Sequence, residues 1–463
     1  MPDHSDGTEY DVIVIGAGPA GEVAAGRLAD GGLSVALVEK HLVAGECSYY
    51  ACMPSKALLR PGELLEEARR VPGVKEAVTG PISIEAALAR RDEVIHDLDD
   101  STQLPWLEKR GINLIRGEGG LEGEKTVRVG DETYSATKAV IVSTGTGAAI
   151  PPIEGIDEVD IWNNRDATTA SVRPDSMIVL GGGPVGCELS QAWASLGTEV
   201  TLVEPEPRLM MREEAFAGKQ VASSLQKNYS VKVVFGAQAK RVSQADGEVT
   251  VELNDGQDLK AEILLMATGR KPMLDGLGLE SVGIDGGGYV KVEENMSVEG
   301  HEWLYAIGDI NGRILLTHMG KYQAWIASEC ILGNPVAEIA EPYGAPRVTF
   351  TDPQVAAVGI TESDARTAGL EFDIVEVPTG AVAGASFYGK DVDGTCRLIV
   401  GKADGTIKGA TFTGFETAEM IHAATIAMVG EVPMDRLRHA VPSFPTRSEI
   451  WLRLSEAYEQ VRG

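Results

Sequence analysis

Residues 11–21 read DVIVIGAGPAG, a β-branched run that leads directly into a glycine-rich turn. The run lacks polar alternation, which predicts a strand buried on both faces of a parallel sheet. The glycines follow the spacing G-x-G-x-x-G at Gly16, Gly18 and Gly21. A helix is expected from there to about Asp30, and a second strand that ends at Glu39 completes a βαβ unit.

The same pattern returns at residues 176–186, which read SMIVLGGGPVG. Its spaced glycines are Gly181, Gly183 and Gly186. A helix through Leu196 and a strand that ends at Glu204 are expected to follow. Two further segments echo each other, VIVSTG ending at Gly145 and LLMATG ending at Gly269. Each predicts a strand and a turn that leave a dinucleotide fold, so the second fold is expected to be inserted into the first.

Each glycine pattern lets backbone N–H groups meet a pyrophosphate at the start of a helix. Glu39 and Glu204 stand where the pattern needs an acid to accept bonds from ribose hydroxyls. The alternative, a glycine-rich turn without a ligand, is less favoured in this context. Two patterns call for two dinucleotides, most economically FAD in one and a nicotinamide in the other. The acid at Glu204 favours NADH, although the nearby Arg208 leaves NADPH open.

The chain has 463 residues and a net charge of −28. This length predicts two to four domains. The acidic surface makes nucleic acid and membranes unexpected partners. Residues 1–7 are short, polar and acidic, so no signal peptide is expected. The five cysteines have no regular framework, which argues against a disulfide-stapled secreted fold and favours a cytoplasmic location.

Two cysteines stand out in the segment CSYYACMPSK at residues 47–56. Helical positions five apart have Cα atoms about 8.7 Å apart, whereas a disulfide needs less than about 7 Å. Cys47 is therefore expected in a turn before a helix, with Cys52 in its first turn and Pro54 near its start. A thiol at a helix N-terminus is a better thiolate. A redox pair is favoured over a zinc site or two inert cysteines, because no further zinc ligands are close in sequence.

These motifs together resemble the flavin-dependent pyridine nucleotide–disulfide oxidoreductases, the group of dihydrolipoamide dehydrogenase and glutathione reductase, from Tyr10 to about Leu454. The resemblance implies that Cys47 faces the substrate and that Cys52 touches the flavin. It also implies an ion pair of Lys56 with Glu188 beside the flavin, and contact of Asp309 with the flavin's ribitol.

The family's fold is α/β, with two Rossmann-like domains and a C-terminal α+β dimerisation domain. The expected segments are 1–150 for the first part of the FAD domain with the cysteine pair, 151–272 for the NAD(P) domain, 273–342 for the second part of the FAD domain, and 343–463 for the dimerisation domain.

One departure from the family concerns the segment FPTRSE at residues 444–449. Typical members have His-Pro-Thr-x-Ser-Glu, supplied by the partner subunit, in which the histidine is the general base and the glutamate orients it. Here Phe444 replaces the base, whereas Glu449 is retained. His439 could in principle substitute for the missing general base. We favour its interpretation as a histidine in a surface turn.

The sequence therefore predicts a homodimeric flavoenzyme with a shared active site and a small-molecule substrate. Hydride would pass from NAD(P)H through the flavin to Cys47 and Cys52, and then to an acceptor other than lipoamide. Two alternatives stay open: a flavin-only quinone or dye reductase, and a nicotinamide-binding flavoprotein sensor with little turnover. No metal site is expected. The sequence leaves undetermined the acceptor, the resting state of the cysteine pair and the proton donor that replaces the histidine.

Overall fold

The computed structural model describes residues 8–341, 343–389 and 394–463. The chain forms two compact units, one of residues up to 54, 92–149 and 270–338, the other of 55–91, 150–269 and 339–463. Residues 1–7, on which the signal-peptide expectation rests, and Pro342, where the sequence places a domain boundary, lie outside the described residues.

A mixed sheet forms the core of the first unit. Its strand order is β17 (Ser297–Val298), β18 (His301–Ala306), β6 (Glu132–Val142), β1 (Glu9–Ile15), β2 (Val35–Glu39) and β3 (Asn113–Arg116), with β4 (Gly119–Leu121) and β5 (Thr126–Val129) joined to β6. The central strand β1 runs parallel to both of its neighbours, β2 and β6. It is buried on both faces, as its unbroken apolar run predicts.

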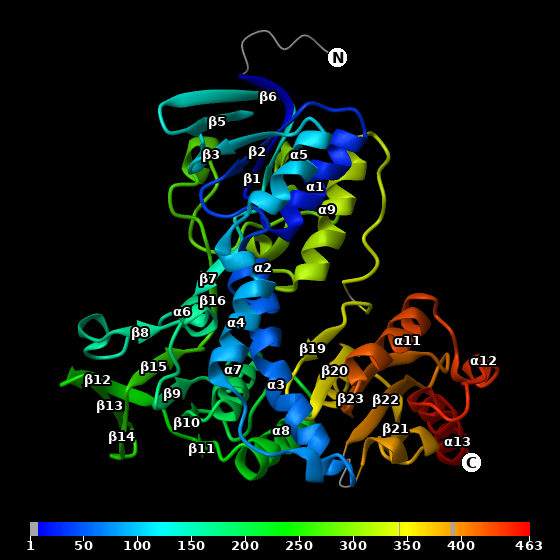
Figure 1. The fold of residues 1–463 in the computed structure, drawn as a ribbon. Helices are drawn as coiled ribbons and strands as arrows, with labels where there is room; N and C mark the ends of the chain where they lie inside the picture. The colour runs from blue at the N-terminus through cyan, green and yellow to red at the C-terminus, as the bar shows by residue number, and fades with distance from the viewer. Residues whose placement is uncertain (1–7, 342, 390–393) are drawn as a thin grey trace. The chain divides into compact units, whose positions relative to one another are not determined.

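Helices connect the strands of this sheet and pack against it. They are α1 (Pro19–Asp30), α2 (Gly45–Tyr49), α5 (Leu104–Lys109) and α9 (Thr317–Ile331). Helices α1 and α9 lie side by side and share one apolar core with β1 and β2 (Figure 1). A short antiparallel pair, β7 (Thr146–Ala148) with β16 (Arg270–Pro272), marks where the chain leaves this unit and where it returns.

The second unit contains another dinucleotide fold. Its parallel sheet has the order β11 (Lys232–Phe235), β10 (Glu199–Glu204), β9 (Ser176–Leu180), β15 (Ile263–Met266) and β8 (Ile161–Trp162). Its helices are α6 (Asn164–Thr169), α7 (Pro184–Ser195) and α8 (Ala215–Asn228), and the antiparallel strands β12 (Ala239–Ala245), β13 (Glu248–Leu253) and β14 (Asp258–Ala261) form a separate small sheet. The buried Trp193 of α7 belongs to the core of this unit.

An antiparallel sheet with flanking helices completes the second unit. Its order is β19 (Arg347–Thr349), β20 (Gln354–Gly359), β23 (Ile407–Gly414), β22 (Thr395–Gly401) and β21 (Phe372–Pro378). The helices are α10 (Glu362–Thr367), α11 (Thr417–Val429), α12 (Met434–Leu437) and α13 (Ile450–Arg462). Helix α11 packs on β20 and β23, and α13 packs on β21 (Figure 1). The α/β architecture with an α+β C-terminal part confirms the predicted fold class.

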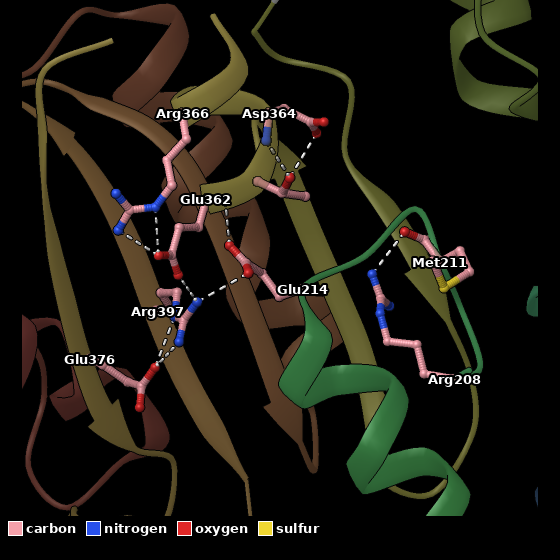
Figure 2. Close-up of polar contacts among 9 residues, drawn as sticks. Arg208, Met211, Glu214, Glu362, Asp364, Arg366, Glu376 and Arg397 are labelled. Atoms are coloured by element: carbon pink, nitrogen blue, oxygen red, sulfur yellow. Dashed lines mark hydrogen bonds and ion pairs between the residues drawn. The ribbon is translucent and has the colours of Figure 1, made fainter. Parts of the chain in front are cut away.

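A charge network joins the dinucleotide fold of the second unit to this antiparallel sheet. Arg397 on β22 pairs with Glu214 at 3.0 Å, with Glu362 at 2.9 Å and with Glu376 at 2.7 Å (Figure 2). Glu214 is the residue before α8 and is buried. A buried carboxylate needs such partners, because an unpaired charge would be costly there.

The local structure around the cysteine pair differs from the expectation in one respect. Cys47 lies in the short helix α2 rather than in a turn. Two residues separate α2 from α3 (Cys52–Arg70), which begins at Cys52 itself and has Pro54 in its first turn. The next α-helix along the chain is α4 (Ile84–Val94). The break at Tyr50 and Ala51 prevents one continuous helix, whose geometry would hold the two sulfurs apart.

We predict that Gly21→Ala destabilises the protein by about 1–3 kcal/mol or more, because a Cβ atom there would lie 1.9 Å from the Gly16 carbonyl oxygen. Urea denaturation of the purified protein measures the effect. Gly286→Ala is the matched control, since its Cβ would meet nothing within 4 Å. Equal stability of the two variants would contradict the predicted close packing.

Candidate active site

The turn between β1 and α1 presents bare backbone at the start of a helix. A Cβ atom at Gly18 would meet no heavy atom within 4 Å, so a ligand can approach this peptide closely. Helix α1 begins at Pro19 without a side-chain cap. Its first-turn N–H groups and the positive end of its dipole favour a phosphate. The turn therefore fits the pyrophosphate of a dinucleotide.

Glu39, the last residue of β2, fixes a carboxylate beside this turn. Its Oε2 accepts a hydrogen bond from the Ala17 N–H at 2.7 Å, and its Oε1 accepts one from the His41 N–H at 2.7 Å. The side chain is half-buried. The carboxylate thus stands at the end of the strand, where the motif places the ribose of a bound dinucleotide.

Asp309 lies in a 3₁₀ turn directly after β18 and is the acid predicted to meet the flavin's ribitol. Its Oδ2 accepts a hydrogen bond from the Thr146 hydroxyl at 2.7 Å, and Arg270 lies 3.9 Å away. Burial raises the pKa of Asp309, while Thr146 and Arg270 act in the opposite direction. Arg270 also lies 3.8 Å from Glu46, the neighbour of Cys47, so it links the half-buried carboxylate of Asp309 to the cysteine helix α2.

The glycines that end the VIVSTG and LLMATG segments, which we expect to border the two cofactors, both have backbone angles that favour glycine. Gly145 has φ 72° and Gly269 has φ 140°, and a Cβ at either would meet nothing within 4 Å. Both positions are therefore open to the approach of a ligand.

The cysteine pair lies at the start of α9. Cys47 and Cys52 are half-buried free thiols, and Cys52 Sγ lies 3.6 Å from the hydroxyl oxygen of Thr317, the first residue of α9. A hydrogen bond with Cys52, together with burial, raises the pKa of the Cys47 thiol. Thr317 and the charge of Lys321 lower it. The thiolate of Cys47 thus depends on its polar neighbours for stabilisation.

Glu22 and Lys321, two residues that the sequence motifs do not reveal, lie in the same unit. Glu22, in the first turn of α1, is half-buried, and burial raises its pKa to about 7. Lys321 on α9 lowers the pKa of Glu22, and the charge of Glu39 raises it. Lys321 therefore acts electrostatically on both Glu22 and Cys47.

The second glycine turn repeats the features of the first. A Cβ at Gly183 would meet nothing within 4 Å, and a Cβ at Gly186 would lie 1.8 Å from the Gly181 carbonyl oxygen. The buried Glu204 accepts hydrogen bonds from the N–H of Gly182 at 2.6 Å and from that of Glu206 at 2.9 Å. This turn fits a second dinucleotide.

Arg208 points its guanidinium at backbone carbonyls near the second turn. It donates to the carbonyl oxygen of Met210 at 2.7 Å and to that of Met211 at 2.9 Å; Figure 2 shows the second bond. Both terminal guanidinium nitrogens of Arg208 therefore donate hydrogen bonds to backbone carbonyls of this chain.

Lys56 and Glu188 form an ion pair within the second unit. Lys56 Nζ lies 2.7 Å from Glu188 Oε2, and the other carboxylate oxygen accepts the N–H of Phe350 at 2.8 Å. The Lys56 amine also lies 4.8 Å from the centre of the Phe350 ring, at a distance suited to a cation–π contact. The side chain of Glu188 is only 7% exposed, so the pair fixes a cation near the start of α3.

The segment that departs from the family pattern follows α12. Phe444 is 75% exposed in one chain. Glu449 is buried, and its Oε2 has no hydrogen-bond partner among the described residues. Arg447 stacks on the ring of Tyr388 at 5.1 Å, and its nitrogens likewise find no hydrogen-bond partner in the described part of the chain. Glu449 and Arg447 therefore form no hydrogen bond with each other.

Several residues around the site escape the motif analysis. Arg270 directly follows the Thr268-Gly269 turn, so its position beside that segment was an available signal. Thr317 comes eight positions after Asp309 and carried a weaker signal. Lys321 carried no such signal, because only the packing of α9 brings it near the cysteines. Within the described ranges, no group of three metal-ligating side chains gathers. None of the described helices has both the length and the apolar character needed to cross a bilayer.

Two family sequence models match the chain. Residues 10–324 match the model described as pyridine nucleotide-disulphide oxidoreductase, and residues 345–454 match the dimerisation domain of the same family.

Curated relatives align along nearly the whole chain. Dihydrolipoyl dehydrogenase of Chlorobaculum parvum is 32% identical, with 99% of each chain covered. The enzyme of the same name from Bacillus subtilis is 32% identical over 97% of this chain and 96% of its own. Mercuric reductase of Staphylococcus aureus is 30% identical over 95% of this chain and 81% of its own.

Solved structures share the fold. The Cu(II) complex of the HOCl-induced flavoprotein disulfide reductase RclA from Escherichia coli superimposes with a TM-score of 0.86 at 25% identity, over 97% of this chain and 99% of its own. LpdA from Mycobacterium tuberculosis gives a TM-score of 0.86 at 25% identity, over 98% of this chain and 99% of its own.

Proposed function

The chain belongs to the pyridine nucleotide–disulphide oxidoreductase family, and we propose that it is a homodimeric enzyme that reduces an unusual acceptor through Cys47 and Cys52. Members of this family use FAD and a pyridine nucleotide. The observation that supports the proposal most directly is the position of the cysteine pair. Cys52 contacts Thr317 in the same unit that holds the Gly18 turn, Glu39 and Asp309.

The residues of the first unit hold the flavin and the dithiol in this proposal. The α1 turn and Glu39 bind the pyrophosphate and ribose, and Asp309 binds the ribitol. When bound, FAD would supply the transfer of two electrons from a nicotinamide to the Cys47–Cys52 disulfide. The Sγ–Sγ bond breaks as the pair is reduced. Cys47 then delivers the two electrons to the acceptor, and the disulfide forms again.

The second glycine turn binds the nicotinamide nucleotide, with a preference for NADH. Glu204 accepts from the ribose hydroxyls and repels the additional phosphate of NADPH. Arg208 offers that phosphate little, because it already donates to the carbonyls of Met210 and Met211. Lys56, fixed by Glu188 and Phe350, supplies a positive charge beside the flavin, in the role that its family position implies.

Phe444 makes the acceptor unusual. The C-terminal domain matches the family's dimerisation domain, and in the proposed homodimer Phe444 of one chain lies over the dithiol of the partner. Its exposed ring is then covered, and it excludes water without accepting a proton. Glu449 has no base to orient there. The acceptor is therefore a small molecule other than lipoamide. The location that we propose, the cytoplasm, rests on the irregular spacing of the cysteines.

We predict that Cys47→Ser lowers NADH-dependent turnover of the acceptors that the enzyme reduces by about 100-fold or more, because the sulfur that meets the acceptor is lost. Steady-state rates with a panel of disulfides, quinones and metal ions measure this. Cys330→Ser, which removes another half-buried free thiol, is the control and keeps full activity.

Undiminished turnover by Cys47→Ser would remove the dithiol from the mechanism and would favour a flavin-only quinone or dye reductase. Failure of both NADH and NADPH to reduce the wild-type protein would instead favour a nicotinamide-binding sensor.

We also predict that Phe444→His raises lipoamide reduction by about 10²- to 10⁴-fold, the usual contribution of a general acid–base group. Phe444→Leu is the control, since it opens the site without adding a base. Equal lipoamide activity of the His and Leu variants would show that Phe444 does not occupy the position of the family's base.

A further inference from the structure

We infer that Arg270 is a positioning residue that offsets the charge of two carboxylates, Glu46 and Asp309, beside the turn between β1 and α1. Glu46 directly precedes Cys47, and Asp309 is the acid that we propose for the flavin's ribitol. The inference rests on the proposed function in that FAD occupies this turn. It assigns roles to Glu46 and Arg270, which the sequence motifs leave without one.

Hydrogen bonds and a strand pair fix the guanidinium of Arg270. Its Nε donates to the hydroxyl oxygen of Thr146 at 2.7 Å, and one terminal nitrogen donates to the Thr146 carbonyl oxygen at 2.7 Å. Thr146 is buried, and its hydroxyl donates in turn to Asp309 Oδ2 at 2.7 Å. Strand β16, which contains Arg270, pairs with β7, which contains Thr146. The guanidinium therefore has a defined position next to Asp309.

Two carboxylates lie at nearly the same distance from this guanidinium. Arg270 Nη2 lies 3.8 Å from Glu46 Oε1, and Arg270 Nε lies 3.9 Å from Asp309 Oδ2. The three side chains are 23% to 25% exposed, so water screens their charges only in part. The charge of Glu46 raises the pKa of Asp309, whereas that of Arg270 lowers it. One cation thus acts on two anions that repel each other.

Helix α2 begins against the turn that we propose for the pyrophosphate. A Cβ atom at Gly45, the first residue of α2, would lie 2.8 Å from the Cα atom of Gly18. Glu46 follows in the first turn of α2. A bound pyrophosphate would therefore meet the negative charge of Glu46 as well as that of Asp309, and like charges oppose its binding. Arg270 lowers this repulsion, so the three residues together permit an acid next to Cys47.

The test measures the rate at which the FAD-loaded holoenzyme releases FAD, by ultrafiltration at successive times and absorbance of the filtrate. Arg270→Met should accelerate release about 3- to 10-fold, because both carboxylates then act on the pyrophosphate without this cation. Glu46→Gln should not accelerate release, since it removes a like charge. The double variant Arg270→Met/Glu46→Gln should release FAD about 3-fold more slowly than Arg270→Met.

Two further variants separate charge from structure. Arg270→Lys keeps the charge but not both bonds to Thr146, so it should release FAD more slowly than Arg270→Met. Arg128→Met is the matched control, because it removes an arginine of the same unit whose contact with Glu122 is also 3.9 Å long. It should leave the release rate unchanged. The difference between Arg270→Met and the double variant should shrink between about 0.05 M and 1 M NaCl.

Equal release by the double variant and Arg270→Met would overturn the inference, because Arg270 would then act on the dinucleotide without regard to Glu46. Faster release by Glu46→Gln alone would also overturn it. These rates need no turnover. If Cys47→Ser kept full activity while Glu46→Gln still slowed release from Arg270→Met, the proposed electron transfer through the dithiol would fail and the role of Arg270 would stand.

Discussion

The contact between the Cys52 sulfur and the Thr317 hydroxyl joins the start of α3 to the start of α9. Around this contact the first unit gathers residues that are far apart in sequence. The turn before α1 offers open backbone for a phosphate, and the half-buried carboxylate of Asp309 accepts a hydrogen bond from the Thr146 hydroxyl. The contact at the start of α9 therefore holds the dithiol in the same unit as the groups that suit a flavin dinucleotide.

Charge, rather than a proton carrier, is what the described residues supply to the dithiol. The family's histidine is replaced by Phe444, whose side chain is exposed in one chain and cannot accept a proton. Burial and the neighbouring thiol both oppose ionisation of Cys47, whereas Thr317 and Lys321 favour it. Burial and the neighbouring thiol outweigh these two groups, so the pKa of the Cys47 thiol lies above its ordinary value.

The sequence predicted the parts of the fold that depend on short-range patterns. The strands β1 and β9, the glycine turns and the helices after them follow from apolar runs and from steric limits at Gly21 and Gly186. It missed the edge strand β21, in which acidic residues interrupt the apolar pattern, and it expected a turn where Cys47 lies in a helix. Thr317 and Lys321 escaped because their relation to the cysteines arises only from the packing of helices.

Electron transfer to the dithiol is tested most directly by anaerobic reduction of the air-oxidised holoenzyme with one equivalent of NADH, followed by acid quenching and thiol labelling. We expect the label to appear on Cys47 and Cys52, as detected by mass spectrometry, because the electron pair passes to their disulfide. Loss of the flavin's visible absorbance with both cysteines unlabelled would contradict it, since the electrons would then remain on the flavin.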